Sequence, residues 1–406
     1  MLTDDATILG LLAATLGFVF YTSGSDSPAW QRFYRYVPAL LLCYFLPALY
    51  NTLGLIDGAN SKLYFIASRY LLPATLVLLT LAINLPAIVR LGPKALTLFL
   101  AGTASVILGA PLALWVVGLV SPETVGGEVW RGLTAVAGAW IGGGANQAAM
   151  KDVFEIPADI FGAMVAVDVI VANVWMAILL YLAARSREID ARRGVDTSVV
   201  DVLRDEVAQF EKEHSRNPSL RDLMLICALG FGLMGLSHLI GGPLARWIGA
   251  VAPQLSIYSL TSDFFWVVVL ATTFGLIASF TPARSLEGAG ASKVGSVLLY
   301  VLVATIGMQM DLGAIVERPG LFAVGAVWMS FHALVMFTVL HLLRAPLFFL
   351  GVGSMANIGG AASAPVVAGA FHPALAPVGV LLAVLGYALG TYGGWLAGQL
   401  MRWVAG

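Results

Sequence analysis

The sequence predicts an all-α polytopic membrane protein with two inverted repeats of about five transmembrane helices, each with a glycine-rich broken or re-entrant segment. Composition, a series of apolar runs and an internal repeat lead to this prediction. Of the 406 residues, 59% are hydrophobic and 11% are charged, whereas soluble domains carry roughly 25% charged residues. One aqueous core stops growing near about 250–300 residues. The composition therefore excludes a soluble enzyme, a disordered chain and a disulfide scaffold.

Long apolar runs recur along the chain, and a membrane-spanning helix needs about 20 mostly apolar residues. The runs are 6–22, 34–53, 63–89, 95–119, 131–155, 158–184, 221–241, 262–281, 294–310, 320–343, 346–371 and 374–404. A membrane β-barrel would show short alternating segments instead. We expect no cleavable signal peptide, because Asp4 and Asp5 precede the first run where a basic region would be needed.

One polar stretch divides the chain into three parts. The first transmembrane repeat is 1–184, the linker is 185–220, and the second repeat is 221–406. Apolar residues within 199–210 recur near helical spacing, which predicts a short amphipathic helix in the linker. Basic residues are concentrated in the linker and at its edges. The positive-inside rule therefore places the linker in the cytoplasm.

The two halves resemble each other in sequence. Residues 84–89 (NLPAIV) match 311–316 (DLGAIV), and residues 141–167 align without a gap to 358–384. The second alignment contains three identical glycine pairs, at 142 and 359, 143 and 360, and 162 and 379. The two matched blocks follow each other in the same order in both halves. The order of the matched blocks indicates an internal duplication, which is typical of repeat-built transporters.

The orientation of the halves depends on the fifth and eleventh runs. If both runs cross the membrane, the halves are parallel; if both turn back, each half crosses five times and the halves are inverted. The basic residues fit either arrangement. Glycines interrupt both runs, and each glycine weakens a helix by about 1 kcal/mol relative to alanine. This favours broken segments, as in many secondary transporters, over close packing through small residues.

Asp168 lies in the middle of an apolar run (IFGAMVAVDVIVANVWMAILL). A carboxylate there costs at least about 2.5–3.5 kcal/mol on insertion scales. It is predicted to bind the coupling ion or to carry a proton, and the alternative is a hydrogen-bonded structural aspartate. The aligned residue in the second half is Leu385, so ion coupling is expected to be asymmetric.

Polar side chains flank the two glycine breaks. Asn146, Gln147, Asn357 and Ser363 offer oxygens that, with freed backbone carbonyls, suit Na⁺. The predicted Na⁺ ligands are Asn146, Asp168 and Ser363. Amide groups at half-helix N-termini suit an anionic solute group. No cofactor is expected beyond Na⁺ or H⁺ as the coupling ion.

Four further polar residues fall within or beside apolar runs. Tyr387 and Thr391 are one helical turn apart, so they either line a path or hydrogen-bond within the bundle. His332 is interpreted as a hydrogen-bonded packing residue, and the alternative is a proton relay. Lys151 lies at the end of a run, where a lysine is expected to extend toward the interface.

The predicted substrate- and ion-binding residues form one set around the breaks. They are Gly142, Gly143, Gly144, Asn146, Gln147, Asp168, Asn357, Gly359, Gly360, Ser363, Tyr387 and Thr391. The sequence contains no HExxH motif, no nucleophile elbow with a triad and no Walker loop. We therefore expect neither an enzyme nor an ATP-driven pump.

Four short segments resemble the YjcL-like membrane proteins, a family of unknown function. They are 142–146 (GGGAN), 165–168 (VAVD), 357–360 (NIGG) and 385–392 (LGYALGTY). That family is considered related to the cation:proton antiporter and anion transporter group, which includes sodium:glutamate and citrate symporters. The resemblance implies inverted five-helix repeats, re-entrant hairpins, a core moving against a scaffold that often dimerises, and a bacterial inner membrane.

The predicted function is an ion-coupled secondary transporter that moves a small, anionic organic solute by alternating access, driven by Na⁺ or H⁺. The alternatives are a cation:proton antiporter that exchanges ions at Asp168, and a passive channel. The expected partners are the solute, the lipid bilayer and a second copy of the chain in a homodimer. Nucleic acid is not expected, because 22 basic residues balance 23 acidic ones.

Overall fold

The computed structural model describes residues 1–34, 37, 39–58, 60–198, 200, 217–310, 318–372 and 375–405. Most of the predicted linker helix at 199–210 lies outside these residues, as does the 311–316 block of the repeat. The described chain is helical, and its β-structure is limited to a single bridge between Leu2 and Ile56. Seven of its helices are long and apolar enough to cross a membrane, or nine if each bent pair is one span. The prediction of an all-α polytopic membrane protein is confirmed.

The helices of the first half follow the predicted runs. They are α1 (Asp5–Ser23), α2 (Pro28–Tyr34), α3 (Ala39–Thr52), α4 (Leu63–Ile66), a π-helical turn (Ala67–Leu71), α5 (Leu72–Leu81), α6 (Leu85–Arg90), α7 (Gly92–Val120), α8 (Pro122–Val125), α9 (Val129–Gly142), α10 (Gly144–Val153), α11 (Ala158–Ala184) and α12 (Ser186–Arg192). The third run is divided between α5, which ends at Leu81, and α6, which Asn84 caps by accepting from the Ala87 amide at 3.2 Å.

The second half also contains long helices, short helical turns and a broken helix pair. Its elements are α14 (Leu220–Val251), a 3₁₀ turn (Pro253–Tyr258), α15 (Asp263–Ser279), a 3₁₀ turn (Pro282–Ala289), α16 (Ala291–Gly307), α18 (Gly320–Leu342), α19 (Leu347–Ile358), α20 (Gly360–Phe371) and α21 (Ala376–Ala405). A capping box at Ser219 and Asp222 begins α14.

The fifth run forms a helical hairpin, which we call hairpin 1 (α9 and α10). The ring of Trp130 at the start of α9 lies 6.1 Å from the ring of Phe154 just after α10, so the two arms return to the same end. With 14 and 10 residues, the arms are about 21 and 15 Å long at 1.5 Å per residue. Neither arm can cross a hydrocarbon core of about 30 Å.

The eleventh run forms the corresponding hairpin 2 (α19 and α20). The rings of Phe348 and Phe371, at its open end, lie 5.4 Å apart. Each arm has 12 residues and is about 18 Å long. Two hairpins that turn back are the arrangement under which the halves are inverted. The inversion itself stays a prediction.

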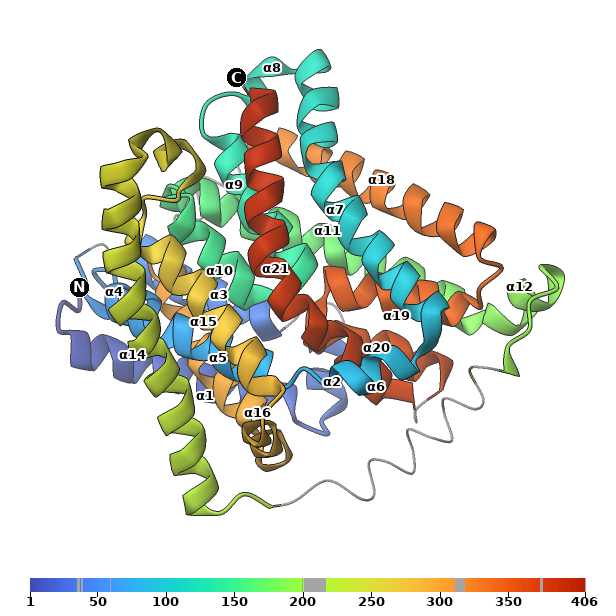
Figure 1. Cartoon of the computed structure of the whole chain (residues 1–406), viewed down its shortest axis with the longest axis horizontal. Helices are drawn as coiled ribbons and strands as arrows, with labels where there is room; N and C mark the ends of the chain where they lie inside the picture. The colour runs from blue at the N-terminus through green and yellow to red at the C-terminus, as the bar shows by residue number, and fades with distance from the viewer. Residues whose placement is uncertain are drawn as a thin grey trace.

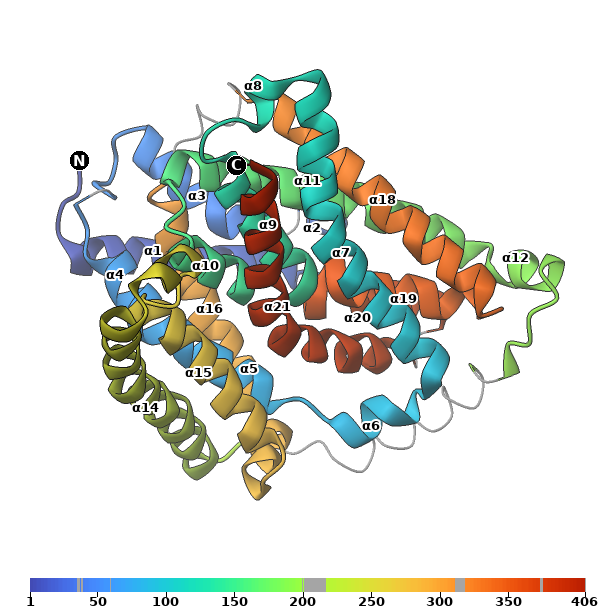
Figure 2. The same cartoon turned by 45° about the horizontal axis from the view of Figure 1, so that its top comes forward.

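The helices pack into two groups, which lie side by side in Figures 1 and 2. The hairpin group contains both hairpins with α7, α11, α18 and α21; the flanking group contains α1, α3, α4, α5, α14, α15 and α16. Helices of each half pack on a helix of the other half. From the first half, α1 and α3 pack on α16; from the second half, α14 and α15 pack on α5. The boundary between the groups is formed chiefly by α10 and α21, which both contact α5 and α15.

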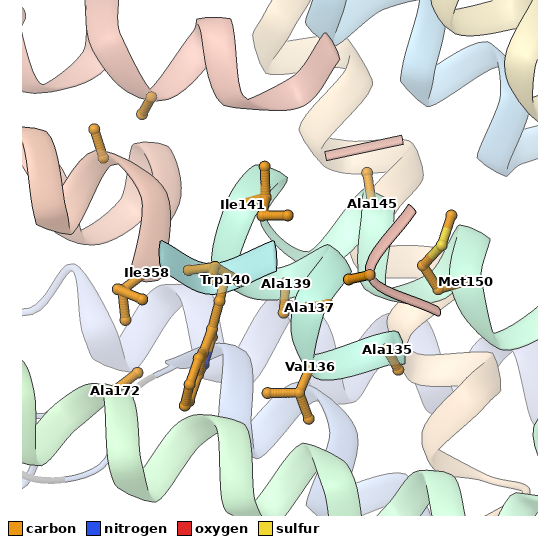
Figure 3. Packing of buried hydrophobic residues seen from close by; sticks show 14 of the residues in the cluster. Ala135, Val136, Ala137, Ala139, Trp140, Ile141, Ala145, Met150, Ala172 and Ile358 are labelled. Atoms are coloured by element: carbon orange, nitrogen blue, oxygen red, sulfur yellow. The ribbon is translucent and has the colours of Figure 1, made fainter. Parts of the chain in front are cut away.

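Small side chains bring the helices of the hairpin group close together. Figure 3 shows Ala135, Ala137, Ala139 and Ala145 on the two arms of hairpin 1, together with the large ring of Trp140. Trp140 is fully buried, and its ring lies 4.8 Å from that of Trp328. Such small residues let helix backbones approach closely inside a membrane, where packing rather than hydrophobicity drives association.

Candidate functional site

The tips of the two hairpins meet. Gly143, between α9 and α10, has φ 76° and ψ −172°, a conformation that glycine alone adopts readily. Gly360 begins α20 with φ 58°, and a Cβ atom added to it would lie 3.7 Å from the Gly143 Cα. A Cβ atom on Gly143 would lie 3.8 Å from the Tyr387 ring. The two predicted glycine breaks therefore converge on one point, beside α21.

Asn146 fastens hairpin 1 to α21. Its Nδ2 donates to the carbonyls of Gly142 and Tyr387, both at 3.0 Å, and its Oδ1 accepts from the Thr391 hydroxyl at 2.7 Å. Thr391 also lies 3.0 Å from the Thr272 hydroxyl on α15. Because Asn146 is fully buried, donates both amide hydrogens and accepts from Thr391, the structure shows it as a clamp between helices.

Asn357 makes the same clamp in hairpin 2, on α7. Its Nδ2 donates to the Phe99 and Gly353 carbonyls at 3.0 and 2.9 Å, and its Oδ1 accepts from Thr103 at 2.7 Å. In both clamps the asparagine binds its own preceding turn, then a carbonyl and a threonine four residues later on another helix. The sequence alignment pairs Asn146 with Ser363, yet Asn357 is its counterpart in hydrogen bonding.

Asp168 on α11 is bound by hairpin 1. Its Oδ1 accepts from Trp140 Nε1 at 2.7 Å, and its Oδ2 accepts from Gln147 Nε2 at 2.8 Å. The Tyr44 hydroxyl, from α3 of the flanking group, donates to Gln147 Oε1 at 3.2 Å. Within the described chain, no lysine, arginine or histidine forms an ion pair with Asp168. Asp168 is therefore stabilised by neutral donors. Gln147 alone lies between it and Tyr44 of the flanking group in this chain of hydrogen bonds.

The three predicted Na⁺ ligands are not joined by any hydrogen bond that the described residues make. Asn146 already accepts from Thr391, and Asp168 is held by Trp140 and Gln147. Ser363 lies beside Gly359, where a Cβ atom on the glycine would meet the serine side chain. Of the polar residues predicted at the glycine breaks, Gln147 is hydrogen-bonded to Asp168.

Lys151 corrects one sequence prediction. It does not extend to the interface, since it is only 6% exposed and lies one turn beyond Gln147 on α10. Its ammonium group lies 3.7 Å from the ring centroid of Tyr64 and 5.6 Å from that of Phe161. The Tyr64 hydroxyl donates to Asp152 Oδ1. Asp152 Oδ2 is buried and has no hydrogen-bond partner among the described residues.

His332 packs as the sequence predicts. Its Nδ1 lies 2.7 Å from the Ser105 hydroxyl, and its Nε2 lies 2.7 Å from the Ser354 hydroxyl. Trp175 Nε1 donates to Ser354 at 2.8 Å. This fully buried network ties α7, α11, α18 and α19 together.

Sequence reasoning missed Tyr44 and Trp140 as partners of Asp168. Trp140 comes two residues before the glycine break, and this position was a usable signal, because a buried indole N–H needs an acceptor. Tyr44 had no signal, since its run is far from Asp168 in the chain.

Each hairpin has a hollow at its open end. The hollow at hairpin 1 has a volume of about 330 Å³ and is lined by Arg131, Phe154 and Arg402 among others. The hollow at hairpin 2 has a volume of about 380 Å³ and includes Asp190 and Phe371. The two hollows share no lining residue, and each belongs to the end of a hairpin away from the contact between the tips.

Known proteins are similar to this chain over most of its length. Over 353 residues, covering 84% of both chains, the chain is 25% identical to the uncharacterized membrane protein YjcL of Bacillus subtilis. The family model described as protein of unknown function DUF819 matches residues 10–404. The chain is thus an integral membrane protein that belongs to the DUF819 family.

Proposed function

We propose that this protein is an ion-coupled secondary transporter of a small, anionic organic solute. The observation that carries the proposal is the meeting of two hairpin tips beside Asp168, at the boundary between two helix groups. Broken segments that meet inside a transporter typically form its binding site. The sodium:glutamate and citrate symporters implied by the sequence resemblance carry solutes of this chemical class.

Asp168 supplies the coupling step in this proposal. An unpaired carboxylate at membrane depth is costly, and binding H⁺ or Na⁺ neutralises it. The charge of Asp168 is linked through Gln147 to Tyr44 of the flanking group. Ion binding therefore changes a hydrogen-bonded contact across the boundary at which the groups would move.

Alternating access uses the two hollows in turn. Each lies at the open end of one hairpin, and the touching tips separate them. Movement of the hairpin group against the flanking group would expose the centre to one hollow and then to the other. A continuous channel is less compatible with the packed contact between Gly143 and Gly360.

The second candidate is a cation:proton antiporter, which Asp168 alone would support. In that case exchange of H⁺ and Na⁺ on one carboxylate needs no organic solute. The same residue serves both candidates, so only flux measurements separate them.

The test is transport by the full chain in proteoliposomes, with a panel of labelled carboxylic and amino acids. We expect saturable uptake that requires an inward Na⁺ or H⁺ gradient and falls at least about tenfold in Asp168→Asn, because the ion-binding charge is lost. Asp159→Asn is the matched control on the same helix, since Asp159 lies in the first turn of α11, where it pairs with Arg318 at 3.3 Å.

Other outcomes contradict the proposal. Proton release on Na⁺ addition without any solute favours the antiporter. Unsaturable flux without a gradient favours a channel. Full gradient-driven uptake by Asp168→Asn removes the coupling role of that residue.

A further inference from the structure

Near the end of hairpin 1 lies a largely buried lysine whose ammonium group has no oxygen partner among the described residues. Lys151 is 6% exposed, and no hydrogen bond or ion pair of its ammonium group occurs in the described part of the chain. The Tyr64 and Phe161 rings stabilise it only in part. A buried charge is normally paired or hydrogen-bonded, so this ammonium group has capacity for an anion.

A buried acceptor without a donor lies beside it. Tyr64 donates to one oxygen of Asp152, while Oδ2 of the same carboxylate is buried and has no partner within the described residues. Lys151 and Asp152 do not form an ion pair with each other. Tyr64 touches both residues, with its ring against the ammonium group and its hydroxyl on the carboxylate.

The position of this pair connects it with the coupling residue. Lys151 and Asp152 belong to hairpin 1, whereas Tyr64 belongs to α4 of the flanking group. Lys151 follows Gln147 by one helical turn, about 6 Å along α10, and Gln147 binds Asp168. A solute held here would touch both helix groups beside the proposed ion site.

We propose that Lys151, Asp152 and Tyr64 form the binding site for the head group of the solute, and that the solute is an α-amino or α-hydroxy acid. This inference rests on the transporter function proposed above and specifies its substrate class. The carboxylate of such an acid accepts from Lys151 Nζ. Its neighbouring amino or hydroxyl group donates to Asp152 Oδ2. An acid without that group leaves the Asp152 oxygen without a donor.

The test is binding to the purified full-length protein, measured as the concentration-dependent rise of the melting temperature. The probes are matched pairs: lactate and alanine against propionate, malate against succinate, and glutamate against glutarate. For at least one pair we expect the substituted acid to bind about tenfold or more tightly than its unsubstituted analogue, because a lost hydrogen bond to a charged group is costly.

The variants separate the two halves of the site. Lys151→Gln and Lys151→Met should lose binding of every acid by about tenfold or more, whereas Asp152→Asn should keep weak carboxylate binding and lose the preference within each pair. Lys62→Gln is the matched control, because Lys62 is an exposed lysine at the start of α4. Folding of each variant is checked by monodisperse elution and a cooperative melting transition without ligand.

Three results would overturn the inference: no acid of the panel raises the melting temperature, both members of every pair bind equally, or both folded Lys151 variants bind as the wild type does. The last result, together with ion-driven transport that needs Asp168, removes the binding site and leaves the transporter function. Lys151-dependent binding without any ion-driven flux has the opposite meaning, since the binding site then stands and the transporter function fails.

Discussion

Gln147 connects two helix groups through the opposite ends of one side-chain amide. Its Nε2 binds Asp168 and its Oε1 accepts from Tyr44. All hydrogen-bonding partners here except Asp168 are fully buried. Loss of one partner therefore leaves a polar atom unsatisfied away from water, which costs about 1–3 kcal/mol.

Tyr44→Phe should lower the free energy of unfolding by about 1–3 kcal/mol, because Gln147 Oε1 loses its donor. The same variant should change the ion concentration at half-maximal transport, since the amide that binds Asp168 is no longer held in place. Denaturation in detergent and ion titration of uptake measure the two effects. Tyr21→Phe, an 82% exposed tyrosine, is the control and should change neither. Equal behaviour of both variants would contradict the link.

Individual site residues were only partly predictable from the sequence. Asp168 was identifiable because a carboxylate within an apolar run has few explanations. Its partners were not, because Gln147 and Trp140 reach it only after hairpin 1 folds back. The burial of Lys151 depends on Tyr64, from a distant run, and no hydropathy pattern contains that information. Asn146 and Asn357 were predicted as binding residues near the breaks; the structure shows each as a clamp between helices, and their role in binding stays a prediction.

At the scale of elements, one glycine makes hairpin 1 turn. Gly143 has a backbone conformation closed to most residues, whereas Gly144 is already helical and a Cβ atom on it would meet only Leu299, at 3.9 Å. The break therefore depends on one position of the three consecutive glycines.

Gly143→Ala should destabilise the fold by about 1–3 kcal/mol through backbone strain and should slow transport, because the tip contact with Gly360 shifts. Gly144→Ala should be neutral or slightly stabilising, since alanine favours a helix. Thermal unfolding of the two variants side by side measures the difference. A Gly144 variant that is as damaged as the Gly143 variant would show that the turn needs both glycines.

Element positions were the most predictable part of the fold. Each apolar run contains a helix, because about 20 apolar residues in lipid have few other options. The ends were less predictable. α14 extends ten residues past its run to Val251, with Pro243 inside the helix. The third run is divided between two helices, the second of which begins at the cap Asn84.

At the scale of the whole molecule, the boundary between the two groups is the surface on which function is proposed to depend. Thr272 on α15 and Thr391 on α21 face each other across it, with hydroxyl oxygens 3.0 Å apart. A covalent link at this place would join the groups without altering Asp168.

Thr272→Cys combined with Thr391→Cys, in a background with Cys43→Ala and Cys227→Ala, should stop transport on oxidation and recover it on reduction. The reason is that a disulfide fixes the boundary while the proposed cycle needs it to move. Uptake before and after reductant measures the effect, and each single-cysteine variant controls for the thiols. Transport that continues in a fully oxidised sample would mean that the groups do not move at this boundary.

The homodimer and the bacterial inner membrane stay predictions at this scale, as does the inversion of the halves. The exchange of partners between α3, α5, α15 and α16 supports a two-fold relation of the halves. It was not readable from the sequence, since a weak alignment gives the order of elements and not their contacts.

The asparagine clamps carry a consequence for the ancestry of this protein. Asn146, from the first half, is fastened to a helix of the second, and Asn357, from the second half, to a helix of the first. A single half made alone would keep neither attachment. Under the predicted duplication, an ancestral half would have needed a second copy of itself to supply these attachments, and it would have folded only as a dimer.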